Sequence, residues 1–436
     1  MALWDAARGL PADPEWRERR GADAGELFAH AVAARLAHPA AAHALLQRYK
    51  ARTLLERMLG PGRELPAAAA PVALDEIREA LRPGEVLLDA VEAAELTVIL
   101  GIAADTVITA TLPGARARAD LLRRLEVALT SPAVADPAPV MHLAAEVLAG
   151  LPPSLRARLQ AARAVIWCPD GSLHRLPLAL LTGAEGWLAA DAEVTRVPSA
   201  ALLVHRDEGG LPGGASVLAL HDETMPGAGA ETGWMAARLE DVRRYPGFEA
   251  LATGGVDWRH APVLHLAAHV DLEPRQPWQS AVRLGPGPRG RLRAGDVAAD
   301  TVEARLVVLS GCRSAGSDVV GGEGLLGLGA GFLAAGAPAV VATLWDVDDH
   351  VAARFVADFY GALADGATAA GALAAARQAC RARPETAAPR HWAGFVLVGD
   401  GASRVPVRWR QAWWPLGLLL AGLAVGAVIM GHRREV

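Results

Sequence analysis

The chain has 436 residues, which is enough for two or three domains, and 52 % of them are hydrophobic. A formal net charge of only −5 excludes the broad basic field expected of a nucleic-acid-binding protein. The three cysteines, Cys168, Cys312 and Cys380, lie far apart and include no CxxC pair, which excludes a disulfide framework and a zinc ribbon and indicates a reducing compartment. The basic residues are almost all Arg, and with abundant Ala and Gly this favours a bacterial source.

Residues 1–65 are expected to form an α-helical N-terminal region. Apolar residues recur at spacings of three and four through an Ala-rich stretch that begins at Gly25, which is the pattern of amphipathic helices. Pro61 and Gly62 end this stretch, and residues 66–71 have the composition of a linker. The first residues lack the long apolar stretch of a secretory signal.

Residues 66–210 are expected to form a second region, in which helices and strands mix. The sequence predicts a short helix at 74–81, three strand-like runs with hairpin-length breaks between 85 and 112, and a further strand at 162–169. Two helices are expected between the third and the fourth strand. A seam rich in Gly and Pro at 209–214 marks the boundary of this region.

Residues 211–402 show a cleaner alternation of apolar strands with helices. This pattern predicts an α/β fold with a mostly parallel sheet that is covered by helices on both faces. An inserted hairpin is expected at 279–297. The expected strands are 216–221, 261–270, 305–312, 339–345 and 392–399, and the expected helices are 231–245, 322–336, 349–363 and 369–382.

A run of 20 uncharged residues, 412–431, lies in the C-terminal segment 403–436. As a helix it would be about 30 Å long, the thickness of a hydrocarbon core, and two Trp residues near its start suit a membrane interface. The run therefore predicts a transmembrane tail anchor, single-pass in the cell inner membrane, with the rest of the chain facing the cytoplasm. A buried core helix is the alternative. Gly422 and Gly426 have the small-xxx-small spacing that would allow self-association through the anchor.

Two of the expected strands end on reactive side chains. In a parallel sheet the carboxyl ends of neighbouring strands meet at one edge, where active sites gather. His269 ends one strand and Cys312 another, and a cysteine nucleophile needs such a histidine as its base. The backbone N–H groups of Val270 and Cys312 would then face the developing oxyanion. The alternatives are a Cys312 that is only a small buried hydrophobe, and a metal site, for which His265 and His269 lack a third ligand.

Three acidic residues, Asp346, Asp348 and Asp349, follow the strand expected at 339–345. A carboxylate at the bottom of the first specificity pocket would select Arg or Lys in a peptide substrate. Equally, these carboxylates would suit the first positions of the following helix as capping groups. Asp346, nearest the strand, is the preferred pocket residue, and Asp349 is the second candidate.

The glycine-rich stretch 321–331 invites comparison with a phosphate-binding loop. It lacks the GK[ST] ending of such loops, so we expect a helix packed closely on the sheet instead. Glu323 is then expected at the start of that helix rather than in catalysis. No cofactor and no metal are expected.

Five motifs follow one another along the chain in the order PDGSLHRLPLALL, HLAAHV, VVLSGCRSAG, GGEGLLGLGAGFLAAGAPAVVATLWDVDD and RFVADFYGAL. Together they resemble the CHAT family of caspase-like cysteine proteases, which are related to separase. The likeness extends from about residue 72 to 402. It implies a caspase-like three-layer sandwich, with a degenerate first half (66–210) and an active second half (211–402), and endopeptidase activity from a His269–Cys312 dyad. Val270 departs from the family, which usually has Gly after the catalytic His, and its branched side chain would narrow the oxyanion pocket.

The resemblance implies an endopeptidase that cleaves a partner protein in bacterial defence or regulated cell death, after a basic residue if the acidic pocket is correct. Together with the anchor expected at 412–431, it predicts a membrane-tethered enzyme. One rival is a catalytically silent membrane scaffold, for which Val270 is the best support. A second rival is a thiol hydrolase or transferase for a small substrate, which would need an enclosed apolar pocket.

Overall fold

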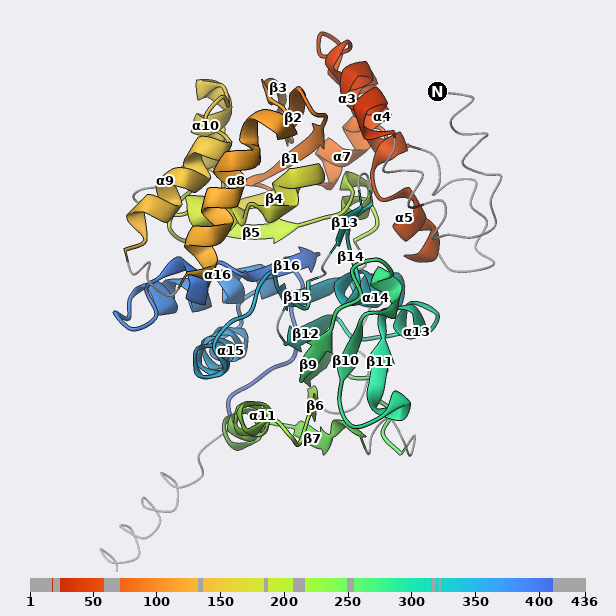
Figure 1. The fold of residues 1–436 in the computed structure, drawn as a ribbon, viewed down its shortest axis with the longest axis vertical. Helices are drawn as coiled ribbons and strands as arrows, with labels where there is room; N and C mark the ends of the chain where they lie inside the picture. Colours follow the sequence, from red (N-terminus) through yellow and green to blue (C-terminus); the bar gives the residue numbers. More distant parts are fainter. Residues whose placement is uncertain are drawn as a thin grey trace, which may run out of the picture.

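The computed structural model describes residues 18, 24–58, 71–131, 136–183, 187–206, 216–248, 255–311, 313–315, 318–320 and 323–410. An 11-stranded sheet runs through this part of the chain (Figure 1). Its two halves come from the two regions expected from the sequence, and they join into one continuous sheet.

The first half of the sheet, whose strands lie between residues 85 and 196, is covered by helices on both faces. Its first three strands form an antiparallel meander, because hairpin-length connections join them. The strands are β1 (Glu85–Glu92), β2 (Leu96–Ala103), β3 (Thr106–Pro113), β4 (Ala164–Cys168) and β5 (Glu193–Arg196), and the helices are α7 (Leu74–Ala80), α8 (Ala115–Thr130), α9 (Ala138–Val147) and α10 (Pro153–Gln160).

The strands of the second half run parallel to one another, with one exception. The strand that comes last in the sequence borders the first half of the sheet and runs antiparallel to its neighbour within the second half. The strands are β6 (Val217–His221), β7 (Val242–Pro246), β8 (Val263–Ala267), β12 (Leu306–Ser310), β15 (Ala339–Thr343) and β16 (Phe395–Gly399), and the helices are α11 (Pro226–Arg238), α13 (Ala294–Ala298), α14 (Leu328–Ala334), α15 (Asp349–Ala364) and α16 (Ala369–Arg381).

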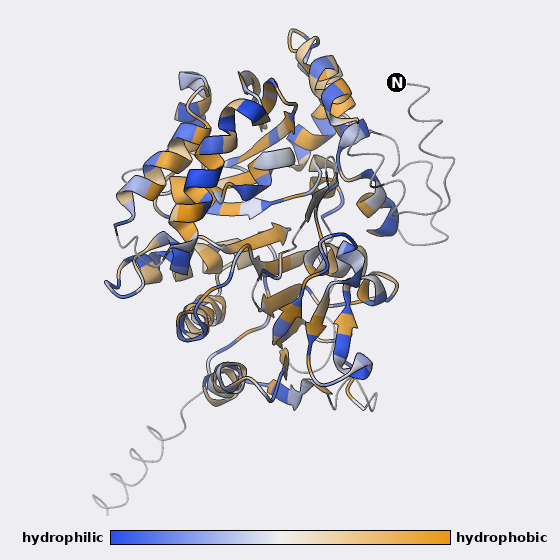
Figure 2. Cartoon of the chain, in the orientation of Figure 1, coloured by the Kyte–Doolittle hydropathy of each residue, from blue (hydrophilic) through white to orange (hydrophobic). Residues whose placement is uncertain are grey.

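The strand order across the sheet is β3-β2-β1-β4-β5-β16-β15-β12-β8-β6-β7. The central strands are buried along nearly their whole length, which explains their continuous apolar sequences, since both faces are covered (Figure 2). One face packs against α8, α9, α15 and α16, and the other against α13 and α14 and the N-terminal helices. The expected α/β fold with a mostly parallel sheet and helices on both faces is confirmed.

A smaller sheet stands beside the main one. It contains β9 (His269–Asp271), β10 (Ala281–Arg283) and β11 (Arg291–Arg293), and β10 and β11 form the hairpin expected at 279–297. The small sheet begins at His269, directly after the end of β8. The chain therefore passes from the main sheet into the small sheet at His269, which the sequence predicts to be a reactive residue.

Two expected helices are corrected by the structure. The stretch 322–336 is a helix only over α14, because Gly324 and Gly327 adopt φ of 88° and 133° and the chain before α14 forms the hairpin of β13 (Asp318–Val320) and β14 (Gly324–Leu326). The helix expected at 231–245 ends at Arg238, where the chain turns through Asp241 at φ 50° and enters the edge strand β7.

The described N-terminal helices are α3 (Gly25–Ala33), α4 (Pro39–Tyr49) and α5 (Arg52–Met58). The last of them is tied to the β13–β14 hairpin, which closely follows position 312 in the chain. The Glu323 carboxylate is 2 % exposed and accepts hydrogen bonds from Thr53 N at 3.0 Å and from Leu54 N at 3.3 Å. Glu323 therefore caps a helix of the N-terminal region and not α14.

Replacing Glu323 by Gln should loosen α5. A hydrogen bond to a charged group contributes about 1.5–3 kcal/mol, so exchange of the α5 amide protons should become roughly 10- to 150-fold faster. Hydrogen–deuterium exchange measures this change, with Glu126→Gln on the exposed surface of α8 as the matched control. Unchanged exchange in α5 would show that the contact does not hold the helix.

Among the helices that the structure describes, none is long and apolar enough to cross a membrane. The segment 412–431, on which the anchor prediction rests, lies outside the described residues. The anchor, the inner-membrane placement and the pairing of Gly422 with Gly426 therefore remain predictions.

Candidate active site

The strands β8 and β12 are neighbours in the sheet, and both end shortly before a predicted reactive position in the chain. They pair in parallel, with Ala267 opposite Ser310 as the last pair. His269 and Cys312 each follow two residues after this pair. Cys312 itself lies outside the described residues, whereas His269 is described and its side chain is exposed.

Gly311 shows how closely the two chain segments approach each other. A Cβ atom at this position would lie 2.3 Å from the carbonyl oxygen of Ala268 and 3.1 Å from Cγ2 of Val270, so no larger residue fits. The Gly311 carbonyl accepts a hydrogen bond from the Thr343 hydroxyl at 2.8 Å, which ties the turn to the end of β15. Arg313 then adopts φ 55°, an uncommon value for a residue other than glycine.

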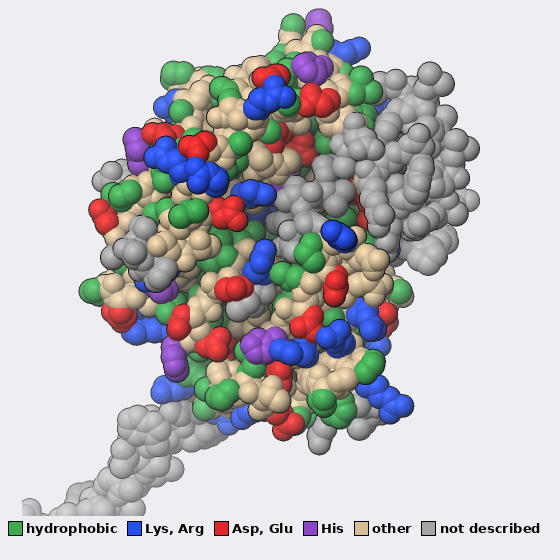
Figure 3. Space-filling view, in the orientation of Figure 1, with side chains coloured by type: hydrophobic (Ala, Val, Ile, Leu, Met, Phe, Trp, Pro, Cys, Tyr) green, Lys and Arg blue, Asp and Glu red, His purple; other side chains and the backbone are tan. Residues whose placement is uncertain are grey.

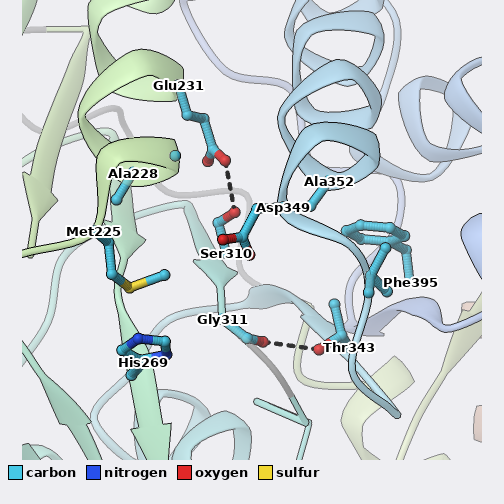
Figure 4. Close-up of a pocket in the computed structure, with 12 residues that line it drawn as sticks. Met225, Ala228, Glu231, His269, Ser310, Gly311, Thr343, Asp349, Ala352 and Phe395 are labelled. Atoms are coloured by element: carbon cyan, nitrogen blue, oxygen red, sulfur yellow. Dashed lines mark hydrogen bonds between the residues drawn. The ribbon is translucent and has the colours of Figure 1, made fainter.

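A pocket opens beside this turn and contains about 490 Å³ of empty space, part of it open to solvent. It lies between the first turns of α11 and α15, with the end of β12 as its floor (Figure 4). His269 stands at one side of it. The lining residues are Met225, Gly227, Ala228, Glu231, His269, Ser310, Gly311, Thr343, Val347, Asp349, Ala352 and Phe395.

The three acidic residues that follow β15 have different positions. Asp349 lines the pocket, and Gly227 on α11 lies so close that a Cβ there would be 3.3 Å from the Asp349 Cβ. Asp348 caps α15, since its carboxylate accepts from His350 N at 3.0 Å and Val351 N at 3.2 Å. Asp346 is exposed and is not among the lining residues. The geometry therefore favours Asp349 over Asp346 as the pocket carboxylate.

Glu231 is a second acidic residue in the pocket, and sequence analysis missed it. Its carboxylate is 6 % exposed and reaches from α11 to Ser310, whose hydroxyl donates to it at 3.0 Å (Figure 4). The other oxygen lies 2.7 Å from Nε2 of His265. The only signal in the sequence was an acidic residue on the face of α11 that is buried. Which face of the helix is buried cannot be recognised from the sequence before the helix is placed against the sheet.

His265 is a buried core residue, as expected, and bridges Glu231 to Tyr360. Its Nδ1 lies 3.2 Å from the Tyr360 hydroxyl. Burial and the nearby Glu231 carboxylate raise the pKa of Tyr360 well above its usual value, so the phenol keeps its proton at neutral pH. The buried ring of His265 thus lies between the Glu231 carboxylate and Tyr360 and helps to hold the carboxylate in the pocket wall.

Val270 lies in β9 and is half-buried, with its side chain against Gly311. The alternative of a metal site at His265 and His269 gains no support. Among the described residues, no group of three or more His, Cys, Asp or Glu is arranged to hold a metal ion. The predicted oxyanion role of Val270 remains a prediction.

The other two cysteines are unsuited to chemistry. Cys168 and Cys380 are free and fully buried. Burial raises the pKa of Cys168 well above its usual value and that of Cys380 to about 11. Both thiols therefore stay protonated and unreactive at neutral pH.

The surface in Figure 3 carries acidic and basic side chains interspersed, without a single-sign field on the visible face. This distribution fits the small net charge of the chain. It gives no electrostatic footprint of nucleic-acid binding on that face.

Comparison with known proteins places this geometry in context. The model of the CHAT domain family matches residues 140–400. Tetratricopeptide repeat protein 28 is 35 % identical in Homo sapiens and 36 % identical in Mus musculus, in both cases over 109 residues, 25 % of this chain and 4 % of that protein.

Among solved structures, the fold is similar to that of separase in the Saccharomyces cerevisiae separase–securin complex. The TM-score is 0.52 and the identity 11 %, over 82 % of this chain and 34 % of that chain. The likeness to separase concerns the fold alone. The chain therefore spans 4 % of the length of tetratricopeptide repeat protein 28 and 34 % of the length of that separase chain.

Proposed function

Because the chain belongs to the CHAT domain family, we propose that it is a caspase-like cysteine endopeptidase that cleaves a partner protein. The observation that carries this proposal is the parallel pairing of β8 with β12. Their last pair is Ala267 with Ser310, so His269 and Cys312 follow this pair by the same number of residues, and His269 lines an open pocket. An open pocket next to a surface His suits a peptide side chain better than a small enclosed substrate.

In the proposed mechanism, His269 accepts the proton of the Cys312 thiol, and the thiolate attacks the carbonyl carbon of the scissile peptide bond. The negative charge on the carbonyl oxygen is stabilised by the backbone N–H groups of Cys312 and Val270. The protonated His269 then gives its proton to the leaving amine. Water, activated by the same imidazole, hydrolyses the thioester and restores the free enzyme.

We assign the pocket to the side chain that precedes the scissile bond. Asp349 and Glu231 give it two carboxylates, and the guanidinium of an arginine is the side chain that bonds carboxylates in the most specific geometry. A substrate with Arg at this position would place positive charge beside Asp349 and its methylenes along Met225 and Phe395.

We further propose that segment 412–431 anchors the enzyme in the inner membrane of a bacterium, with the catalytic domain in the cytoplasm. Twenty uncharged residues in sequence support this placement. A membrane location suits a protein substrate at the same membrane, and a role in defence or regulated cell death is the expectation from the family resemblance.

Fluorogenic tetrapeptides that end in Arg, Lys, Ala or Asp test the activity. The full chain should cleave the Arg peptide fastest and the Asp peptide slowest, and Cys312→Ala should cleave none of them. Equal cleavage by the wild-type chain and Cys312→Ala would contradict the proposed nucleophile.

The second candidate function is a catalytically silent membrane scaffold. The contact of the Val270 side chain with Gly311 is the observation in its favour, since it narrows the space beside the turn. The two functions differ in the effect of Val270→Gly, which restores the residue usual in the family. An enzyme limited by this side chain should gain activity in the variant, whereas a scaffold should stay inactive.

A further inference from the structure

Two buried arginines meet where the two halves of the sheet join. Arg196 ends β5 and pairs with Val398 of β16, which is the parallel pairing between the halves. Arg377 lies on α16, which packs across both of these strands (Figure 1). The side chains are only 4 % and 5 % exposed.

The hydrogen bonds of these two guanidinium groups differ, and those of Arg377 leave donors unused. Arg196 donates from Nη1 to the His174 carbonyl at 3.1 Å and from Nη2 to the Leu176 carbonyl at 2.8 Å. Arg377 donates from Nη2 to the Phe395 carbonyl at 2.6 Å, but its Nε and Nη1 have no partner among the described residues. Within the described part of the chain, neither arginine forms an ion pair with Asp or Glu.

Both groups are nevertheless charged at neutral pH. Burial lowers the pKa of Arg196 to about 10, and burial together with the charge of Arg196 lowers the pKa of Arg377 to about 9. Two buried positive charges without a compensating carboxylate are strongly unfavourable in a protein interior. A negatively charged group that enters between them would remove this penalty.

The two arginines also line one small cavity with about 210 Å³ of empty space, part of it open to solvent. The rest of its wall is largely apolar, with Val194, Val396 and Leu397 among the lining residues. Such a wall has few neutral donors to satisfy the several oxygens of a doubly charged phosphate. The cavity is better suited to a small anion of single charge, which loses less hydration on burial and needs few partners.

We propose that the cavity binds a small inorganic anion of the size of chloride, held between Arg196 and Arg377. The ion joins β5 of the first half to α16 of the second half. It acts as a structural link across the seam and is independent of the chemistry at His269 and Cys312.

The proposal is tested by the Tm of the full chain in sodium chloride and in sodium gluconate at equal ionic strength, because gluconate is too bulky for the cavity. The Tm should be about 2–4 °C higher in chloride and should saturate with chloride concentration. Arg377→Met and Arg196→Met should each lose this difference. Arg116→Met, which changes an arginine on the surface, should retain it.

The comparison uses the chloride dependence rather than the absolute Tm, because removal of an unpaired buried charge can itself stabilise the protein. If one Met variant does not fold, the other still provides the test. Crystals soaked in sodium bromide should show an anomalous peak between the two guanidinium groups. Equal Tm values of the wild-type chain in the two salts, or a chloride effect that persists in both Met variants, would overturn the proposal.

Discussion

His269→Ala should lower kcat/KM for a peptide with Arg before the scissile bond by about 10²–10⁴-fold, the range for loss of a general acid–base group. The imidazole is exposed at the start of β9, two residues after the last pair of β8 and β12. It is therefore free to take the proton of Cys312 without disturbing the core. The variant should fold like the wild-type chain.

The matched control for this prediction is His260→Ala. His260 is also a surface histidine and pairs with Asp257 and Glu303, but it lies at the other end of β8. Its loss should leave kcat/KM unchanged. A similar loss of activity in both variants would point to a general effect on folding, and an active His269→Ala variant would exclude the dyad.

Asp349→Asn should reduce cleavage after Arg by roughly 10- to 150-fold, which corresponds to about 1.5–3 kcal/mol for a hydrogen bond between charged groups. The change removes the charge of a carboxylate in the pocket wall and leaves its shape almost unaltered. Cleavage of a peptide with a neutral residue at the same position should change far less. Steady-state kinetics with the two peptides separate this loss of specificity from a general loss of activity.

Two neighbouring carboxylates provide controls for the Asp349 prediction. Asp346 is exposed and absent from the pocket lining, so Asp346→Asn should retain full activity after Arg. Asp348→Asn should also retain it, since asparagine caps a helix about as well as aspartate. A loss of Arg cleavage in Asp346→Asn with unchanged Asp349→Asn would return the pocket role to Asp346.

The strands of the sheet could be predicted from the sequence because their signal is local. The buried strands β6, β8, β12, β15 and β16 each fall within an expected apolar run, and the parallel arrangement follows from their alternation with helices. The same local signal placed His269 close to the end of β8, which ends at Ala267. The short β7, with its two exposed arginines, lacked an apolar pattern and was mistaken for the end of a helix.

The pocket residues could not be predicted because they depend on contacts between distant elements. Which of Asp346 and Asp349 lines the pocket depends on the direction of the chain after β15. Whether Glu231 lines it depends on which side of α11 faces the sheet. Glu323 was expected at a helix start, and its actual partners, Thr53 and Leu54, are about 270 residues away in sequence.

The rate at which iodoacetamide alkylates Cys312 is the most direct test of the proposed dyad. At about pH 6, a thiolate stabilised by His269 should be alkylated much faster than an ordinary thiol, whose pKa is about 8.5. His269→Ala should remove this advantage, and Cys168 and Cys380 should remain unlabelled in the folded chain because both are buried. Mass spectrometry of the full chain distinguishes the three sites. Alkylation of Cys312 at the rate of an ordinary thiol at both about pH 6 and about pH 8, without an effect of His269→Ala, would contradict an activated cysteine nucleophile.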